Sequence, residues 1–90
     1  MAKILVTPEE IDKASKLFRD SFDQSETMVT KLNSTMASMQ GQWEGMTQTK
    51  FFQQYDQAKR EMENYKKMLD AVSIDLAAIS KRFRDADLQN

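Results

Sequence analysis

The stretch that decides the fold runs from Phe51 to Ala86 and reads FFQQYDQAKREMENYKKMLDAVSIDLAAISKRFRDA. Apolar or aromatic residues recur along it in unbroken steps of four and three. This 3.5-residue repeat is typical of a helix that packs along its length on other helices. The stretch has no Gly and no Pro to end a helix, so we predict one over about 47–87. Its apolar stripe consists of Phe51, Tyr55, Ala58, Met62, Tyr65, Leu69, Val72, Leu76, Ile79, Phe83 and Ala86, and its solvent faces are expected to carry Asp56, Lys59, Arg60, Glu63, Lys66, Lys67 and Lys81.

An earlier helix is predicted over about 8–40. The hydroxyl of Thr7 suits an N-cap, Pro8 suits the first helical position, and Glu10 completes a capping box with Thr7. The stripe of this helix has the same spacing but includes two serines, so its packing seam is expected to be imperfect. It consists of Ile11, Ser15, Phe18, Phe22, Ser25, Val29, Leu32, Met36, Met39 and Trp43, with Ala14, Leu17 and Met28 widening it on one side.

Both glycines of the chain, Gly41 and Gly45, fall between the two stripes. Glycine is the usual residue where a chain leaves a helix and turns sharply. A connection as short as residues 41–45 makes the two helices antiparallel. We therefore predict an all-α fold, in which residues 1–90 form one domain built as a long helical hairpin.

A hairpin this long and thin has little interior, and its wide stripes indicate more than one neighbouring helix. Two hairpins that dimerise into a four-helix bundle would cover these stripes. We predict a homodimer, or a heterodimer with a similar chain, while a monomeric hairpin remains the alternative. The bundle core is expected to contain Phe18, Phe22, Val29, Leu32, Met36, Tyr55, Met62, Leu69, Val72, Leu76 and Ile79.

Composition argues against several classes of protein. The formal net charge of −1 disfavours a nucleic-acid binder, which normally has a basic excess. The chain has neither Cys nor His, which removes thiolate zinc sites and the commonest general base. A two-helix rod also lacks the concavity of an enzyme site. We expect no enzymatic activity, no metal and no cofactor.

The apolar runs are too short for a membrane span or a secretory signal. The longest are Ile4-Leu5-Val6 and Leu76-Ala77-Ala78-Ile79, whereas a spanning helix needs about 20 apolar residues and a signal peptide about 7–15. We expect no stable membrane insertion and no cleaved N-terminal signal.

The tripeptide Trp43-Glu44-Gly45 lies at mid-chain, in the predicted turn of a helical hairpin of 90 residues. Together with the opening Thr7-Pro8-Glu9-Glu10 and the lack of Cys, it resembles the WXG family of small secreted proteins (the Esx or ESAT-like proteins) of type VII secretion in Gram-positive bacteria. The resemblance spans the whole chain. It implies a four-helix bundle, often a homodimer, and a non-enzymatic secreted effector, virulence factor or co-export partner.

The resemblance also implies a route of export and a signal. Members leave the cytoplasm folded, without a signal peptide, through a machine driven by an FtsK/SpoIIIE-type ATPase. The family's export signal combines Trp-x-Gly, here Trp43 and Gly45, with a C-terminal aromatic-x-x-x-acid element, here Phe83 and Asp87. In an antiparallel dimer the turn of one chain would lie beside the termini of the other, so the two parts would form one composite site.

Two other functions compete with export. The first is a cytoplasmic helical adaptor or assembly subunit, and the second is a membrane-active amphipath, which the mixed charges of the polar faces disfavour. Trp43 also has a simpler interpretation, because it continues the stripe from Met39 and would fill the end of a bundle.

Overall fold

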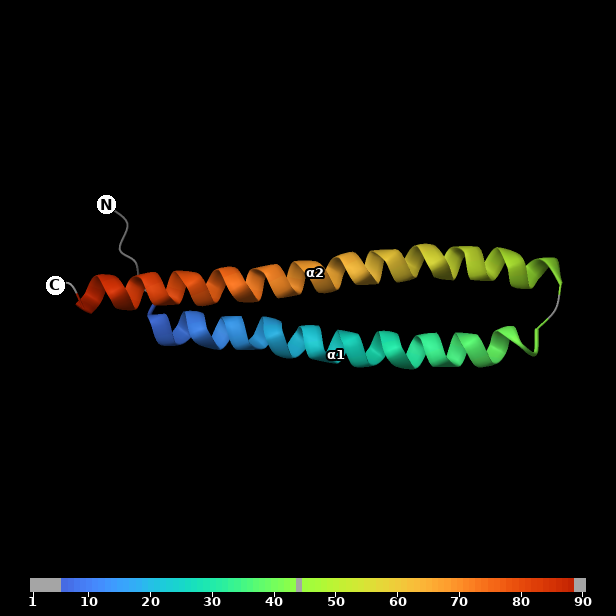
Figure 1. Cartoon of the computed structure of the whole chain (residues 1–90), viewed down its shortest axis with the longest axis horizontal. Helices are drawn as coiled ribbons and strands as arrows, with labels where there is room; N and C mark the ends of the chain where they lie inside the picture. The colour runs from blue at the N-terminus through green and yellow to red at the C-terminus, as the bar shows by residue number, and fades with distance from the viewer. Residues whose placement is uncertain (1–5, 44, 89–90) are drawn as a thin grey trace.

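The computed structural model describes residues 6–43 and 45–88, apart from the side chains of residues 46, 47, 87 and 88. Helix α1 spans Pro8–Gln40 and helix α2 spans Met46–Leu88. The two helices lie side by side and run in opposite directions, with the start of α1 and the end of α2 at one end of the rod and the turn at the other (Figure 1). The rod measures 68 × 24 × 16 Å. The predicted all-α antiparallel hairpin is confirmed.

Helix α1 begins with one of the two hydrogen bonds of the predicted capping box, the one accepted by the N-cap residue Thr7. Thr7 has extended backbone, and its Oγ1 accepts a hydrogen bond from the backbone N–H of Glu10 at 3.2 Å. This bond satisfies one of the free N–H groups at the start of the helix. The carboxylates of Glu9 and Glu10 in the first turn also lie at the positive end of the helix dipole.

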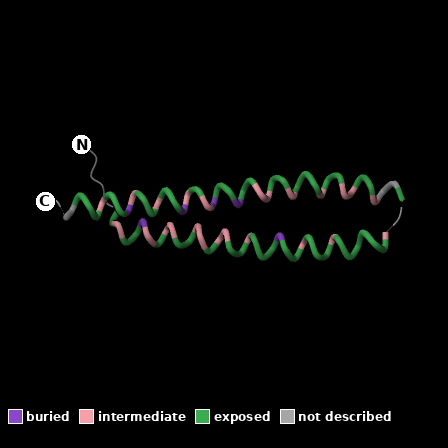
Figure 2. The backbone as a smooth tube through the Cα atoms, in the orientation of Figure 1, coloured by how far each residue is buried: buried purple, intermediate pink, exposed green. Residues whose placement is uncertain are grey.

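Few side chains are fully buried, and these lie where the helices face each other (Figure 2). The buried apolar residues are Ile11 and Val29 on α1 and Leu69 on α2. The other residues predicted for the bundle core are half-buried within this single hairpin: Phe18, Phe22, Leu32, Met36, Tyr55, Met62, Val72, Leu76 and Ile79. One hairpin therefore covers these side chains only in part.

The buried residues of α2 include three polar ones at seven-residue spacing. Lys66 is 8% exposed, Ser73 5% and Ser80 1%. The prediction that Lys66 lies on a solvent face is therefore wrong. Two rows of α2 residues at seven-residue spacing face α1. One row is apolar and consists of Met62, Leu69 and Leu76, and the other is polar and consists of Lys66, Ser73 and Ser80. Helix α1 therefore covers only one edge of the apolar stripe of α2.

The hydroxyls of the two buried serines both have hydrogen-bond partners on α1. Ser73 Oγ lies 3.4 Å from Ser15 Oγ, which also donates to the carbonyl oxygen of Ser73 at 2.8 Å. Ser80 Oγ donates to the carbonyl oxygen of Pro8 at 3.2 Å. Small side chains allow the backbones to approach closely enough for these contacts between helices. Ser15, one of the two serines that made the first stripe imperfect, thus joins α1 to Ser73 of α2, and Ser80 of α2 adds a second contact of this kind.

Candidate functional site

The turn end of the rod carries an aromatic cluster made of Trp43, Phe51 and Phe52. The ring centroid of Trp43 lies 5.3 Å from that of Phe51 and 6.2 Å from that of Phe52, and the two phenylalanine rings meet edge to face at 5.5 Å. These are favourable separations for aromatic pairs. Trp43 is half-buried, so it packs on the first turns of α2 while keeping part of its ring open to solvent.

Gly45 has a backbone φ of 113°, which side-chain-bearing residues rarely adopt. It directly precedes α2, and its carbonyl oxygen accepts a hydrogen bond from the backbone N–H of Thr49 at 3.4 Å. A Cβ added to Gly45 would meet no atom within 4 Å. The requirement for glycine at this position is therefore conformational, and it comes from the way the chain enters α2.

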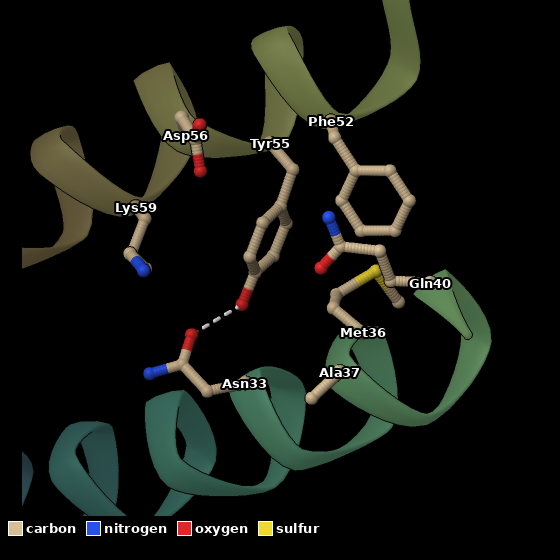
Figure 3. A pocket seen from close by; sticks show the side chains of 8 residues that line it. All are labelled: Asn33, Met36, Ala37, Gln40, Phe52, Tyr55, Asp56 and Lys59. Atoms are coloured by element: carbon tan, nitrogen blue, oxygen red, sulfur yellow. Dashed lines mark hydrogen bonds between the residues drawn. The ribbon is translucent and has the colours of Figure 1, made fainter. Parts of the chain in front are cut away.

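Two shallow hollows flank the aromatic cluster. One, of about 230 Å³, is lined by Met39, Gln42 and Trp43. The other, of about 280 Å³, lies between the helices (Figure 3). At its edge the hydroxyl of Tyr55 donates to Oδ1 of Asn33 at 2.6 Å.

The opposite end of the rod carries the predicted C-terminal element. Phe83 is half-buried, and Asp87 lies in the last turn of α2 but outside the described side chains. Between them, Arg84 Nη2 lies 2.6 Å from Asp12 Oδ2 and 3.8 Å from Glu9 Oε1. The hydrogen bond from Arg84 lowers the pKa of Asp12 below its ordinary value, and the carboxylate in turn raises the pKa of Arg84.

A single chain does not bring the two predicted parts of the signal together. Trp43 and Gly45 lie at the turn, whereas Phe83 and Asp87 lie near the other end of a rod 68 Å long (Figure 1). Within one chain the two elements therefore stay apart.

One flank of the hairpin is closed by polar contacts between the helices. Residues of α1 at seven-residue spacing each meet a residue of α2: Asp12 pairs with Arg84, Arg19 with Asp70, Glu26 with Lys66, and Asn33 with Tyr55. Arg19 Nη2 lies 2.6 Å from Asp70 Oδ1, as close as the contacts of Asp12–Arg84 and Asn33–Tyr55. We call this side the polar flank.

The other flank is apolar. On each helix, the residue that comes directly before a buried residue points to this side. The residue that comes directly after it points to the polar flank. Tyr65, Val72 and Ile79 occupy it on α2, again at seven-residue spacing. Tyr65 is 53% exposed, Met28 of α1 is 59% exposed and Leu17 is 64% exposed. We define the apolar flank as Ala14, Leu17, Met28, Tyr65, Met68, Val72 and Ile79.

Sequence reasoning missed the polar flank. Asp12 and Arg19 are seven residues apart, whereas their partners Arg84 and Asp70 are fourteen apart. Arg84 also lies 39 residues after Gly45, whereas Asp12 lies only 29 residues before Gly41. Pairing opposite charges by their distance from the turn would therefore not have found these contacts.

The described part of the chain offers no group of three or more acidic side chains placed to hold a metal ion. Within residues 6–43 and 45–88, neither helix has a segment long and apolar enough to cross a bilayer.

A family model and a named relative both match nearly the whole chain. Residues 3–88 match the WXG100 family, described as proteins of 100 residues with WXG. The type VII secretion system extracellular protein A of Staphylococcus aureus is 25% identical over 89 residues, which cover 99% of this chain and 92% of that protein.

Solved structures resemble the hairpin along nearly its whole length. The secreted protein EsxB of Bacillus anthracis is 34% identical, with a TM-score of 0.85 over 94% of this chain and 91% of that one. EsxA of Geobacillus thermodenitrificans is 25% identical, with a TM-score of 0.86 over 97% of this chain and 95% of that one. With its Trp43-Glu44-Gly45 turn between two long antiparallel helices, the chain belongs to the WXG100 family.

Proposed function

We propose that this protein is a non-enzymatic small secreted protein, an effector or a co-export partner, that a type VII secretion system exports as a folded dimer. The observation that carries the proposal is the apolar flank, which runs along a hairpin of the WXG100 family and is left open by the fold. The names of the relatives support the route, because they are described as secreted or as extracellular proteins of type VII secretion.

The apolar flank favours a second copy of the chain as its cover. Each large apolar side chain moved from water into a packed interior contributes about 1.5–3 kcal/mol. Tyr65 and Met68 of α2, with Leu17 and Met28 of α1, are 46–64% exposed in one hairpin. Two hairpins that join these flanks make a four-helix bundle with one self-complementary interface.

The polar flank is a less favourable surface for a second copy than the apolar flank. It already uses its charged side chains to bridge α1 and α2, so a partner that docked there would have to desolvate paired charges. The apolar flank carries no such cost. This asymmetry gives the hairpin one preferred face for dimerisation.

An antiparallel dimer would assemble the export signal from two chains. Trp43 and Gly45 of one hairpin would then lie beside Phe83 and Asp87 of its partner. An FtsK/SpoIIIE-type secretion ATPase that reads both parts would accept only assembled dimers.

Export is tested by fractionating cultures that express the full chain with and without the secretion ATPase. We expect the protein in the supernatant only when the ATPase is present. Retention in the cytoplasm under both conditions would contradict the proposal and favour the cytoplasmic adaptor.

Two variants of one cluster separate a signal role of Trp43 from its packing role. Trp43→Ala and Phe52→Ala both remove a ring from the same aromatic cluster. If Trp43 is recognised, only Trp43→Ala abolishes export, while both variants keep the helical content and mass of the parent. Equal export of the two variants would show that Trp43 only packs.

A further inference from the structure

We infer that the aromatic turn end of each hairpin is the docking site for the N-terminal segment of a second copy, with Ile4-Leu5-Val6 seated beside Trp43. This inference rests on the proposed dimer and names a contact within it. It would add a second interface to the one between the apolar flanks.

The site is the hollow of about 230 Å³ lined by Met39, Gln42 and Trp43. A cavity of about 150 Å³ in a protein holds a benzene molecule, so this hollow has room for a branched aliphatic side chain. Met39 is 38% exposed and Trp43 is half-buried. An adaptable methionine and an open indole face make a suitable surface for an aliphatic partner.

The aliphatic segment before α1 is the occupant that we infer for this hollow. Ile4-Leu5-Val6 is an uninterrupted aliphatic run in the sequence, directly before Thr7, the N-cap of α1. Val6, the described member of the run, is 49% exposed. Such a run is unfavourable in water and gains by covering another apolar surface.

The segment cannot reach the turn of its own chain. Six residues before Thr7 span at most about 21 Å when fully extended, whereas the turn lies at the far end of a rod 68 Å long (Figure 1). In an antiparallel dimer, the N-terminus of one copy lies beside the turn of the other. A second copy is therefore the source of the segment.

Charge in the sequence fits the same pairing. Lys3 is the only charged residue among residues 1–8, and Glu44 is the only one between Lys31 and Lys50. The basic segment and the acidic turn thus attract each other, and two copies packed antiparallel would make this contact twice.

Cross-linking tests the contact directly, because the chain has no cysteine of its own. Leu5→Cys and Met39→Cys are made as separate full-length variants, mixed in equal amounts, and oxidised. We expect a disulfide-linked dimer from the mixture and little from either variant alone, since a disulfide needs Cα atoms about 4.4–6.8 Å apart. A mixture of Leu5→Cys with Ser21→Cys, in the middle of α1, is the matched control and should not cross-link.

The other outcomes overturn the inference in distinguishable ways. Strong cross-linking of Leu5→Cys to itself would mean that the two copies run parallel. No cross-link from the mixture, in a protein that sediments as two chains, would remove the N-terminal contact and leave the dimer standing. Sedimentation as a single chain would instead remove the proposed dimer, and this inference with it.

The fluorescence of Trp43 gives a second measurement, because it is the only tryptophan. Leu5→Ser should shift its emission to longer wavelength and make it easier to quench with acrylamide. Ile74→Ser, which changes an aliphatic residue 56% exposed in the middle of α2, should leave the emission unchanged. Unchanged emission of Leu5→Ser in a dimeric protein would contradict the contact.

Discussion

Arg84 of α2 joins Asp12 of α1 through a contact of 2.6 Å between Nη2 and Oδ2, which holds the two chain ends of the rod together. Nη1 of the same guanidinium donates to Oγ of Ser80 at 2.8 Å. Ser80 in turn donates to the carbonyl oxygen of Pro8. These contacts join the last turns of α2 to the start of α1, and they give the buried hydroxyl of Ser80 both a donor and an acceptor.

This pair makes stability depend on pH in the acid range. Because Arg84 lowers the pKa of Asp12 in the folded state, the contribution is complete above the ordinary carboxyl pKa of about 3.9. It is lost as the pH falls through the lowered pKa. Asp12→Asn should therefore unfold at lower urea than the parent at pH 7, and the difference should shrink as the pH falls below about 4.

Asp20→Asn is the control for that measurement. Asp20 pairs with Lys16 of its own helix, at 3.4 Å, and both side chains are exposed. Such a pair contributes about 0.3–0.5 kcal/mol, so this variant should unfold nearly as the parent does. A pH-independent difference between Asp12→Asn and the parent would contradict the assignment.

The two glycines of the turn should respond differently to alanine. Gly45→Ala forces a residue with a side chain to a φ of 113° and should lower the free energy of unfolding by about 1–2 kcal/mol. Gly41 has a φ of −72°, and its added Cβ would come no closer than 3.9 Å to the carbonyl oxygen of Ser38. Gly41→Ala should be neutral or stabilising by up to about 1 kcal/mol; equal losses in denaturant unfolding would refute the conformational role of Gly45.

Lys66 should be replaceable by an apolar residue of similar length. Its stem packs in the seam, with Nζ 5.7 Å from the ring centroid of Phe22 and 3.3 Å from the carboxylate of Glu63. Lys66→Met keeps the packing and avoids burying a charge, so we expect a change within about 1 kcal/mol. Lys66→Ala removes the stem and should cost about 1–3 kcal/mol; thermal unfolding that ranks the two variants in the opposite order would mean that the charge, not the packing, matters.

The apolar flank should control dimerisation. Tyr65→Asp places a charge on that flank at a residue 53% exposed in the hairpin, and it should weaken the dimer at least about tenfold, because 1.4 kcal/mol suffices for that. Ile74→Asp makes a matched change at a residue 56% exposed on the opposite side of α2 and should leave the dimer intact. Equal dissociation constants for the two variants would show that this flank is not the interface.

The sequence was enough to predict the hairpin, because the spacing of its apolar residues, the cap at Thr7 and the glycines of the turn are local signals. It was not enough to predict which edge of the stripe of α2 meets α1. Tyr65 is apolar and Lys66 is charged, so periodicity alone placed Tyr65 inside and Lys66 outside. Contacts between the helices reverse this order.

The contacts of α1 go with this orientation of α2. Asp12 and Arg19 pair with Arg84 and Asp70, and Lys66 faces α1 on the same side. Tyr65, the residue before it, is left 53% exposed. The sequence shows one apolar stripe on α2, whereas the structure divides it between the contact with α1 and the apolar flank.

The roles of Trp43, Gly45, Phe83 and Asp87 in export came from resemblance and stay predictions. The first pair lies between α1 and α2, at the turn end of the rod, and the second lies in the last turns of α2, near the other end. Their proposed union depends on a second copy, which single-chain geometry cannot supply.

The mass of the full-length protein in solution tests the central claim most directly. By sedimentation equilibrium at micromolar concentration, with helical content measured on the same sample, we predict the mass of two chains. A fully helical protein with the mass of one chain would mean that the apolar flank needs no cover, and would contradict both the dimer and the composite signal built across it.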